Sequence, residues 1–269
     1  MPLKQKCVDF AFLGVYNGCS TKLGEINMRN YETELKKRIE FIRERLAEAR
    51  ADGIVFGNSG GKDSALVGIL CKLACDNTVG IIMPCSSKVN FTSDMDDGLE
   101  LAKKFNIETR TVDLTEVKIA AVKAIAAGKE LNKSADTNIA PRLRMLTLYT
   151  VGANENRLVA GTGNRCERFM GYFTKWGDGA CDFNPIGDLK VSEVYEFLRY
   201  LGAPQSIIEK APSAGLFEGQ TDEAEMGVTY AAVEDYIEGK PLGKKETKII
   251  ERYNRVSAHK RKMPPIYGE

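Results

Sequence analysis

The sequence predicts an α/β protein in which a parallel sheet is flanked by helices on both faces. Short apolar or β-branched runs alternate with helical patterns from residue 31 to residue 202. This alternation is typical of βαβ units, whose strands run parallel. A glycine-rich stretch, "GNSGGKDS" at residues 57 to 64, joins the first such run to the helical pattern after it. Because open α/β sheets bind ligands at the carboxyl ends of their strands, we expect this stretch to line a cleft.

The expected elements follow in chain order. Residues 31–50 form an amphipathic helix, because their apolar residues recur at spacings of three and four. Residues 186–202 show helical spacing and end at Gly202, a residue typical of helix ends. Residues 211–228 are rich in small and acidic residues, as in a surface loop or lid. The remaining expected strands are residues 54–56, 79–83, 108–112 and 158–160, and the remaining expected helices are residues 64–74, 94–105, 115–127 and 142–154.

Composition is that of an ordinary globular chain and excludes several function classes. Thirty-eight basic residues balance 37 acidic ones, so no overall field attracts nucleic acid or an anionic membrane. The seven cysteines are scattered without a CxxC pair, which favours reduced thiols in the cytoplasm over disulfides or a zinc site. Asp9 interrupts the apolar run of residues 7–20, so this run is not a signal sequence, and no stretch is long enough to span a membrane. We therefore expect a cytoplasmic protein with neither nucleic acid nor membrane as a partner.

The phosphate loop, residues 59–64, has the chemistry of an anion site. Its two glycines allow close backbone approach, its two serines can donate, and the dipole of the following helix favours negative charge. It differs from the Walker A loop because Lys62 is followed by Asp63, where a hydroxyl is required. A helix cap formed by Ser59 and Asp63 is the alternative, but a cap needs neither the double glycine nor two serines. Because a carboxylate repels phosphate, we expect Asp63 to hold a cation or a nearby donor.

The phosphate loop resembles the S-G-G-x-D-S signature of the N-type ATP pyrophosphatases, which cleave ATP between the α and β phosphates and transfer AMP. Two further stretches, "NIAPRLRM" at 138–145 and "FTKWGDGACD" at 173–182, follow it in the order found in NAD synthetases. From about residue 31 onward the chain is similar to the ammonia-dependent form of that family. The resemblance implies an adenine nucleotide alpha-hydrolase-like, Rossmann-like fold, with residues 1–30 as an N-terminal extension and residues 31–269 as a single domain.

The resemblance also implies a reaction. The carboxylate of nicotinic acid adenine dinucleotide (deamido-NAD) attacks the α phosphorus of ATP, and ammonia then displaces AMP from the acyl adenylate. ATP is the co-substrate and Mg²⁺ the implied cofactor, with Asp63 and Glu167 as its ligands, since a hard cation takes carboxylate oxygens. The implied ATP-binding residues are Ser59, Gly60, Gly61, Lys62, Asp63, Ser64, Met83, Thr162, Lys190 and Ser213.

The other substrate has its own implied set of residues. Two aspartates, Asp178 and Asp182, could attract ammonium and accept a proton as ammonia attacks. Tyr172 and Phe173 could supply a face for the pyridine ring. The implied deamido-NAD-binding residues are Arg142, Tyr172, Phe173, Lys175, Asp178, Asp182, His259 and Lys260, and the implied catalytic residues are Asp178, Asp182 and Lys190.

Several of these residues also have interpretations that involve no ligand. Lys62 occupies a slot of the phosphate loop that is often apolar in the family, so it either adds a phosphate contact or points to solvent. His259 matches a K-H-K-R ending of the family, but Ala258 replaces its first lysine. The remaining alternatives are a surface turn at Lys175 and Asp178, a half-buried anchor at Trp176, a solvated helix face at Arg142 and Arg144, and an exposed basic tail at His259.

Two other functions compete with the synthetase. A tRNA-thiolating ATP pyrophosphatase needs a reactive cysteine pair and a basic surface, whereas Cys71 and Cys75 fall in an apolar helical pattern and the charge is balanced. A nucleotide-binding sensor would not require the two metal carboxylates. Glutamine-using relatives carry a separate glutaminase domain, for which no space precedes the motifs near residue 57. We therefore expect free ammonia as the nitrogen donor and, from the resemblance, a homodimer.

Overall fold

A parallel sheet of four strands forms the centre of the computed structural model, which describes residues 29–85, 93–210 and 221–268. The strands are β1 (Gly53–Gly57), β2 (Thr78–Ile82), β3 (Glu108–Thr111) and β4 (Arg157–Ala160). Their order in the sheet is β3-β2-β1-β4, and β1 pairs in parallel with both β2 and β4. The chain therefore reverses its direction across the sheet between β1 and β4, which opens a crevice at the carboxyl ends of these two strands.

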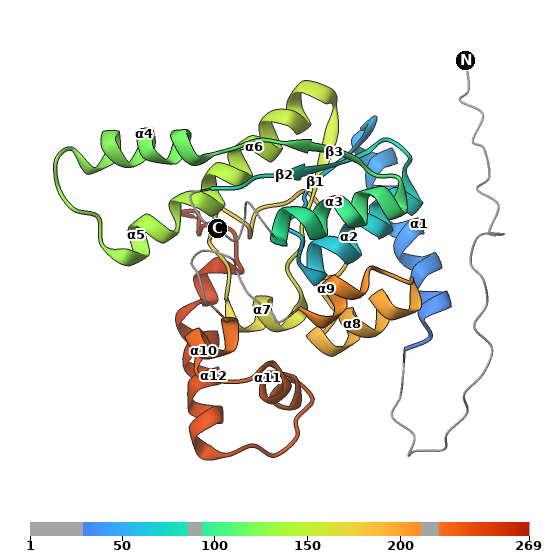
Figure 1. The fold of residues 1–269 in the computed structure, drawn as a ribbon. Coiled ribbons are helices and arrows are strands. Elements are labelled where there is room, and N and C mark those ends of the chain that lie inside the picture. The colour runs from blue at the N-terminus through green and yellow to red at the C-terminus, as the bar shows by residue number, and fades with distance from the viewer. Residues whose placement is uncertain (1–28, 86–92, 211–220, 269) are drawn as a thin grey trace.

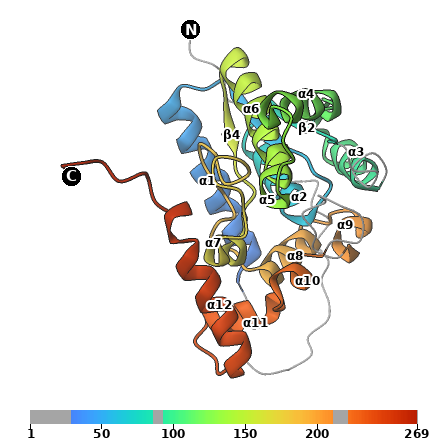
Figure 2. The same ribbon diagram turned by 90° about the vertical axis from the view of Figure 1, so that its left-hand side faces the viewer.

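Helices cover both faces of this sheet (Figures 1 and 2). On one face lie α1 (Tyr31–Ala49), α2 (Lys62–Ala74), α3 (Ser93–Phe105), α8 (Val191–Tyr200) and α9 (Gln205–Glu209). On the other face lies α6 (Ile139–Glu155), with α4 (Thr115–Ala126) and the short α5 (Lys133–Thr137) beside it. The buried side chains of β1 alternate between the two cores, because Ile54 and Phe56 pack with α1, α2 and α8 whereas Val55 packs on the side of α6.

The C-terminal helices build a third apolar cluster below the sheet (Figure 1). It contains Met170, Met226, Val233 and Ile250, which are all nearly inaccessible to solvent. These residues lie on α7 (Arg165–Met170), α10 (Asp222–Met226), α11 (Tyr230–Ile237) and α12 (Lys244–Val256), and a 3₁₀ turn (Ala258–Lys260) follows. The cluster fixes α7 at the crevice, directly after β4. Within the described part of the chain, no helix combines the length and the apolar character needed to cross a membrane.

The predicted fold class is confirmed, and the expected strands and long helices are present with small shifts at their ends. Residues 186–202 are helical only over Val191–Tyr200, because Ile186 and Leu189 are buried in the turn that precedes this helix. The expected loop of residues 211–228 is wrong at Asp222–Met226, which form α10 because the side chain of Thr221 caps it by accepting from the Ala224 N–H. Residues 211–220, and residues 1–28 of the expected N-terminal extension, lie outside the described residues.

Candidate functional site

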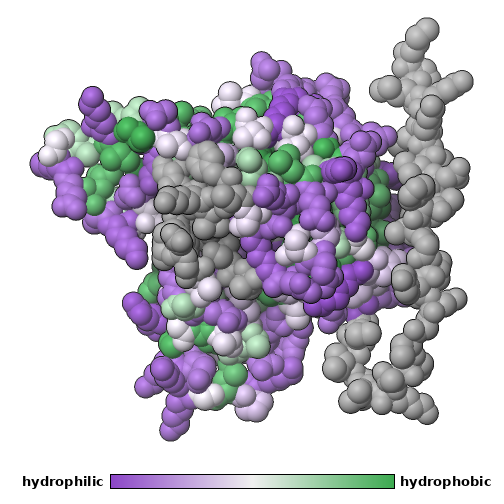
Figure 3. All heavy atoms as spheres, in the orientation of Figure 1, coloured by the Kyte–Doolittle hydropathy of each residue, from purple (hydrophilic) through white to green (hydrophobic). Residues whose placement is uncertain are grey.

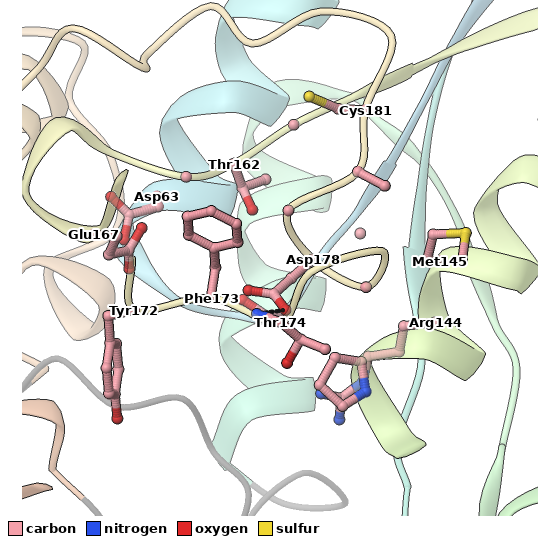
Figure 4. Close-up of a pocket in the computed structure, with 18 of the residues that line it drawn as sticks. Asp63, Arg144, Met145, Thr162, Glu167, Tyr172, Phe173, Thr174, Asp178 and Cys181 are labelled. Carbon is pink, nitrogen blue, oxygen red and sulfur yellow. Dashed lines mark hydrogen bonds between the residues drawn. The ribbon is translucent and has the colours of Figure 1, made fainter. Parts of the chain in front are cut away.

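A cavity of about 1490 Å³ opens at the carboxyl ends of the strands. The segments that follow β1, β2 and β4 contribute Ser59, Met83 and Gly161 to its wall, so the cleft expected at the glycine-rich stretch is present and three segments converge on it. Single small-molecule sites measure roughly 300–1,000 Å³. The cavity therefore has room for two ligands side by side. Figure 4 shows the part of its wall formed by α2, α6, α7 and the segment after α7.

The phosphate loop is held in shape by its own hydroxyl groups. The Oγ atoms of Ser59 and Ser64 lie 3.0 Å apart, and Ser64 Oγ donates to the Gly61 carbonyl, also at 3.0 Å. Gly60 has a φ of +72°, and a Cβ there would lie 2.1 Å from the carbonyl oxygen of Asp94. Only glycine fits this position. The loop presents the first turn of α2 to the cavity, and the dipole of this 13-residue helix favours an anion there.

The acidic pair consists of Asp63, from the phosphate loop, and Glu167, from α7, and the two side chains lie close together (Figure 4). Asn164 links Asp63 to the start of α7, because its side-chain amide donates to Asp63 Oδ1 at 3.2 Å and its Oδ1 accepts from the backbone N–H of Glu167 at 3.0 Å. Glu167 Oε2 in turn accepts from the Asn164 N–H at 2.9 Å, which completes a capping box at the start of α7. Burial and the neighbouring charge of Asp63 raise the pKa of Glu167 well above its usual range. Two such close carboxylates favour a proton or a cation between them.

Lys62 places one positive charge at the acidic pair. Its ammonium donates to Asp63 Oδ2 at 2.6 Å, and only 7% of the residue is exposed. The same ammonium lies 6.0 Å from the ring centre of Tyr195 and 5.7 Å from that of Tyr230. Burial alone would lower the pKa of Lys62, but the charges of Asp63 and Glu167 raise it. The alternative in which Lys62 points to solvent is therefore wrong.

The acidic pair fits a magnesium ion that also binds substrate. Mg²⁺ keeps several waters and is held by one or two carboxylates together with substrate phosphates. Asp63 and Glu167 supply two carboxylates next to a loop suited to phosphate. Over the residues that the structure describes, no group of three or more His, Cys, Asp or Glu could hold a metal ion by itself. A metal ion at this pair would need phosphate oxygens to complete its coordination.

Another part of the wall is formed by the segment after α7, where Asp178 accepts from the Thr174 N–H at 2.9 Å (Figure 4). Lys260, from the far end of the chain, donates to the carbonyls of Gly171 at 2.9 Å and Phe173 at 2.7 Å and so fixes this segment. Desolvation raises the pKa of Asp178 and lowers that of Lys260, although the Asp178 side chain remains open to the cavity. A carboxylate with a raised pKa accepts a proton more readily. Residues 175–179 do form a turn in which Asp178 is exposed, and this turn faces the cavity, so the catalytic role of Asp178 stays a prediction.

Most of the predicted site residues line this one cavity. They come from the phosphate loop, from the end of β2, from the segments that flank α7 and from the C-terminal turn. The set consists of Ser59, Gly61, Lys62, Asp63, Ser64, Met83, Thr162, Glu167, Tyr172, Phe173, Asp178 and Lys260.

Other predicted residues are not part of the cavity wall, and their roles stay predictions. The ammonium of Lys190, at the start of α8, pairs with Glu238 instead. Asp182 lies against the sheet, where its carboxylate accepts from the Val159 N–H at 2.7 Å. Ser213 lies outside the described residues. The described residues that were predicted but do not line the cavity are Gly60, Arg142, Lys175, Asp182, Lys190 and His259.

Arg144 lines the cavity and the buried Asn164 holds the acidic pair, but neither residue was predicted to be part of the site. Arg144 donates from Nε to the Met83 carbonyl at 3.1 Å and lines the cavity, and burial lowers the pKa of its guanidinium. The interpretation of Arg144 as part of a solvated helix face is therefore wrong. Successive helical residues are ~100° apart, so Arg142 and Arg144 point in different directions and only the fold shows which faces the cavity. Asn164 could have been found, because N-x-x-E is a capping-box pattern.

The cysteines do not favour the tRNA-thiolating alternative. Cys71 is buried and Cys75 partly buried, and burial raises the pKa of both thiols above the ordinary value. A thiol with a raised pKa is a poor nucleophile, since only the thiolate attacks. Neither residue lines the cavity. Cys181 is the one cysteine among the described residues of the wall, and burial raises the pKa of its thiol as well. The reactive cysteine pair that thiolation needs is therefore absent from the described wall of the site.

A parallel sheet that carries a phosphate loop and an acidic pair at its carboxyl edge defines a nucleotide-binding enzyme of the adenine nucleotide alpha-hydrolase type. The family model of NAD synthase matches residues 34–264, and the chain belongs to this family. It is 47% identical to the NH₃-dependent NAD⁺ synthetase of Carboxydothermus hydrogenoformans, over 88% of this chain and 98% of that relative. The predicted family and its ammonia-dependent form are thus confirmed.

Two solved structures are similar over nearly the whole described fold. The NMN synthetase from Francisella tularensis superposes with a TM-score of 0.85 at 38% identity, and the match covers 90% of this chain and 100% of the Francisella chain. The NH₃-dependent NAD synthetase from Campylobacter jejuni superposes with a TM-score of 0.73 at 32% identity and covers 88% of this chain and 99% of its own. The first structure is named as a synthetase of NMN and the second as a synthetase of NAD, so the two names differ in the product.

Proposed function

We propose that the protein amidates deamido-NAD with ammonia in an ATP-dependent reaction. The carboxylate oxygen attacks the α phosphorus of ATP and pyrophosphate leaves. Ammonia then attacks the acyl carbon of the adenylate, loses a proton, and displaces AMP, which keeps the carboxylate oxygen. The observation that carries the proposal is that one cavity contains both the phosphate loop with its acidic pair and the segment around Asp178.

The phosphate loop and the acidic pair act on ATP. Backbone amides at the start of α2 and the hydroxyl of Ser59 receive the phosphates, because donors and the helix dipole converge there. Asp63 and Glu167 would hold Mg²⁺, which when bound neutralises the charge that develops on the departing pyrophosphate. Asn164 keeps the two carboxylates oriented toward each other through the capping box.

The segment after α7 acts on the nicotinate end of the substrate. Phe173 lines the cavity and offers a ring face to the pyridine. Asp178 attracts ammonium and accepts the proton that ammonia loses, a role suited to a carboxylate whose pKa is raised. Lys260 keeps this segment in place through the Gly171 and Phe173 carbonyls.

The purified chain tests this function directly. It is incubated with ATP, Mg²⁺, deamido-NAD and ammonium, and the products are separated by chromatography. We expect NAD, AMP and pyrophosphate in equal amounts. Glutamine in place of ammonium should give no more product than a reaction without a nitrogen source, and efficient turnover with glutamine would refute ammonia as the donor.

A second candidate substrate is nicotinic acid mononucleotide, favoured by the similarity to the Francisella NMN synthetase. The reacting group is the same nicotinate carboxylate, so the mechanism above would apply without change. The two substrates differ only in the adenylate half, which a mononucleotide lacks. Comparing kcat/KM for deamido-NAD and for the mononucleotide decides between them, and a higher value for the mononucleotide would exclude deamido-NAD as the main substrate.

We further propose a cytoplasmic homodimer. None of the residues of α4 is buried, its Val117, Ile119 and Ile125 are 46%, 53% and 66% exposed, and Figure 3 shows apolar residues at this end of the molecule. Exposed apolar side chains of this kind suit contact with a second copy. The reduced cysteines of the described chain are suited to the cytoplasm. Light scattering at micromolar concentration should give twice the monomer mass, and a fully active monomer would contradict the dimer.

A further inference from the structure

Lys62 is a buried cation that the proposed reaction does not use. It directly precedes Asp63, and its ammonium donates to Asp63 Oδ2 at 2.6 Å. The other carboxylate oxygen of Asp63, Oδ1, accepts from the side chain of Asn164 at 3.2 Å. Both oxygens of this proposed metal ligand are therefore engaged by groups of the chain itself, and a metal ion at Oδ2 would compete with the ammonium of Lys62.

The surroundings of Lys62 favour a positive charge in this place. Asp63 and Glu167 both attract its ammonium, and the rings of Tyr195 and Tyr230 lie 6.0 and 5.7 Å from it. Ring faces carry negative potential and attract cations at this range. Tyr230 is itself held by its hydroxyl, which donates to Asp222 Oδ2 at 2.9 Å. The ammonium thus lies in a preformed cage of carboxylates and aromatic rings.

We propose that Lys62 is a built-in counter-ion that neutralises the acidic pair in the free enzyme and opposes divalent cations until nucleotide phosphates arrive. A divalent cation at Asp63 would lie a few ångströms from the ammonium, and like charges at that distance repel strongly in a partly buried site. Phosphate oxygens add negative charge and metal ligands together, so they make room for both cations. Binding of metal and of nucleotide is then coupled through this lysine. The inference rests on the assignment of the acidic pair as metal ligands in the proposed function.

The test measures Mn²⁺ binding to the free enzyme by electron paramagnetic resonance, without nucleotide. Lys62→Met removes the charge and keeps the apolar stem, and we expect its Kd for Mn²⁺ to fall at least ~10-fold, the scale of removing one nearby unit charge. Lys62→Arg keeps the charge and should bind Mn²⁺ as weakly as the unchanged protein. Lys72→Met is the matched control, because Lys72 lies on the same helix and pairs with Asp76 at 3.2 Å outside the cavity. Its Kd should not change.

Further variants make each outcome decisive. Asp63→Asn added to Lys62→Met should abolish the tighter binding, which locates the ion at the acidic pair. An unchanged or weaker Mn²⁺ affinity in Lys62→Met overturns the proposal, and so does tight binding that survives the loss of Asp63. If Lys62→Met does not fold, Lys62→Gln removes the charge but keeps a donor, and the same comparison applies. Because no substrate is present, the outcome is separate from the NAD-forming assay, whose failure would refute the proposed reaction alone.

Discussion

The two ends of the cavity are built by different means. At the phosphate end, the loop between β1 and α2 and the start of α7 are fixed by short-range contacts, such as the bond of Ser59 to Ser64 and the capping box of Asn164. At the nicotinate end, the segment that carries Phe173 and Asp178 is held by Lys260, 87 residues further along the chain than Phe173. Each of the two segments at the phosphate end is therefore shaped locally, and they meet at the bond from Asn164 to Asp63. The shape of the segment at the nicotinate end depends in addition on how the C-terminal helices pack.

The largest effect is expected from Asp63→Asn at the phosphate end. The substitution keeps shape and hydrogen bonding to Asn164 but deletes the charge that holds the metal, so turnover should fall at least ~10²-fold, the scale of one major electrostatic contact at a transition state. Steady-state formation of NAD measures this loss. Glu167→Gln should behave in the same way.

The control is binding of deamido-NAD without ATP, measured by calorimetry, which should change little because the nicotinate end is intact. If Asp63→Asn and Glu167→Gln both keep near-normal, Mg²⁺-dependent turnover, the acidic pair does not hold a metal. Glu167 would then serve only to cap α7, through the hydrogen bond that its carboxylate accepts from the Asn164 N–H.

The next effect is expected from Asp178→Asn at the nicotinate end. Loss of the proton acceptor should lower kcat by roughly 10- to 100-fold, at or below the lower end of the usual contribution of a general base, because ammonia is itself a base. Desolvation raises the pKa of Asp178, and the opposite charge of Lys260 offsets only part of this rise. Asp178 therefore becomes protonated, and stops accepting protons, at a pH above the usual range of an aspartate. The acid limb of the kcat profile, at constant free ammonia, should therefore vanish in Asp178→Asn. A limb that persists unchanged would show that another group titrates.

The same difference between the two ends explains what could be predicted from the sequence. The phosphate loop was identified because a continuous stretch carries its chemistry, and Asp63 and Glu167 do lie together. The orientation of Arg144 into the cavity and of Lys190 toward Glu238 was not predicted, because it depends on helix rotation and on the packing of α11. The strands were predicted well since β1 and β2 are buried on both faces and appear as short apolar runs.

Lys260→Met should have a smaller effect that is confined to the nicotinate end. The ammonium makes two hydrogen bonds to carbonyls, and hydrogen bonds to charged groups contribute about 1.5–3 kcal/mol each at most, less where the group is half-buried. We expect the KM for deamido-NAD to rise several-fold while the KM for ATP stays constant. Initial-rate kinetics with each substrate varied would measure the split. Lys248→Met, an exposed change on α12, is the control, and equal rises in both KM values would contradict a local role.

The smallest effect should come from Glu155→Gln, because Glu155 lies at the amino edge of the sheet, away from both ends of the cavity. Glu155 pairs with Arg110 at 2.5 Å and Arg157 at 2.8 Å. The hydrogen bonds from Arg110 and Arg157 lower its pKa to about 2. Because the folded pKa is depressed, the stabilisation is present above the ordinary glutamate pKa and is lost as the pH falls toward 2. Urea unfolding should show a loss of up to ~1 kcal/mol at neutral pH that disappears in acid, with unchanged turnover. A loss that is constant with pH would contradict the ion-pair origin.

The central claim is that the two ends act on one acyl adenylate, and an isotope experiment tests it most directly. Deamido-NAD labelled with ¹⁸O in both carboxylate oxygens is converted with unlabelled ATP and ammonia, and the products are analysed by mass spectrometry. The account predicts one ¹⁸O in the phosphate of AMP, one in the amide of NAD and none in pyrophosphate, because the carboxylate oxygen attacks the α phosphorus and leaves with it. Label in pyrophosphate or inorganic phosphate, or AMP without label, would contradict it.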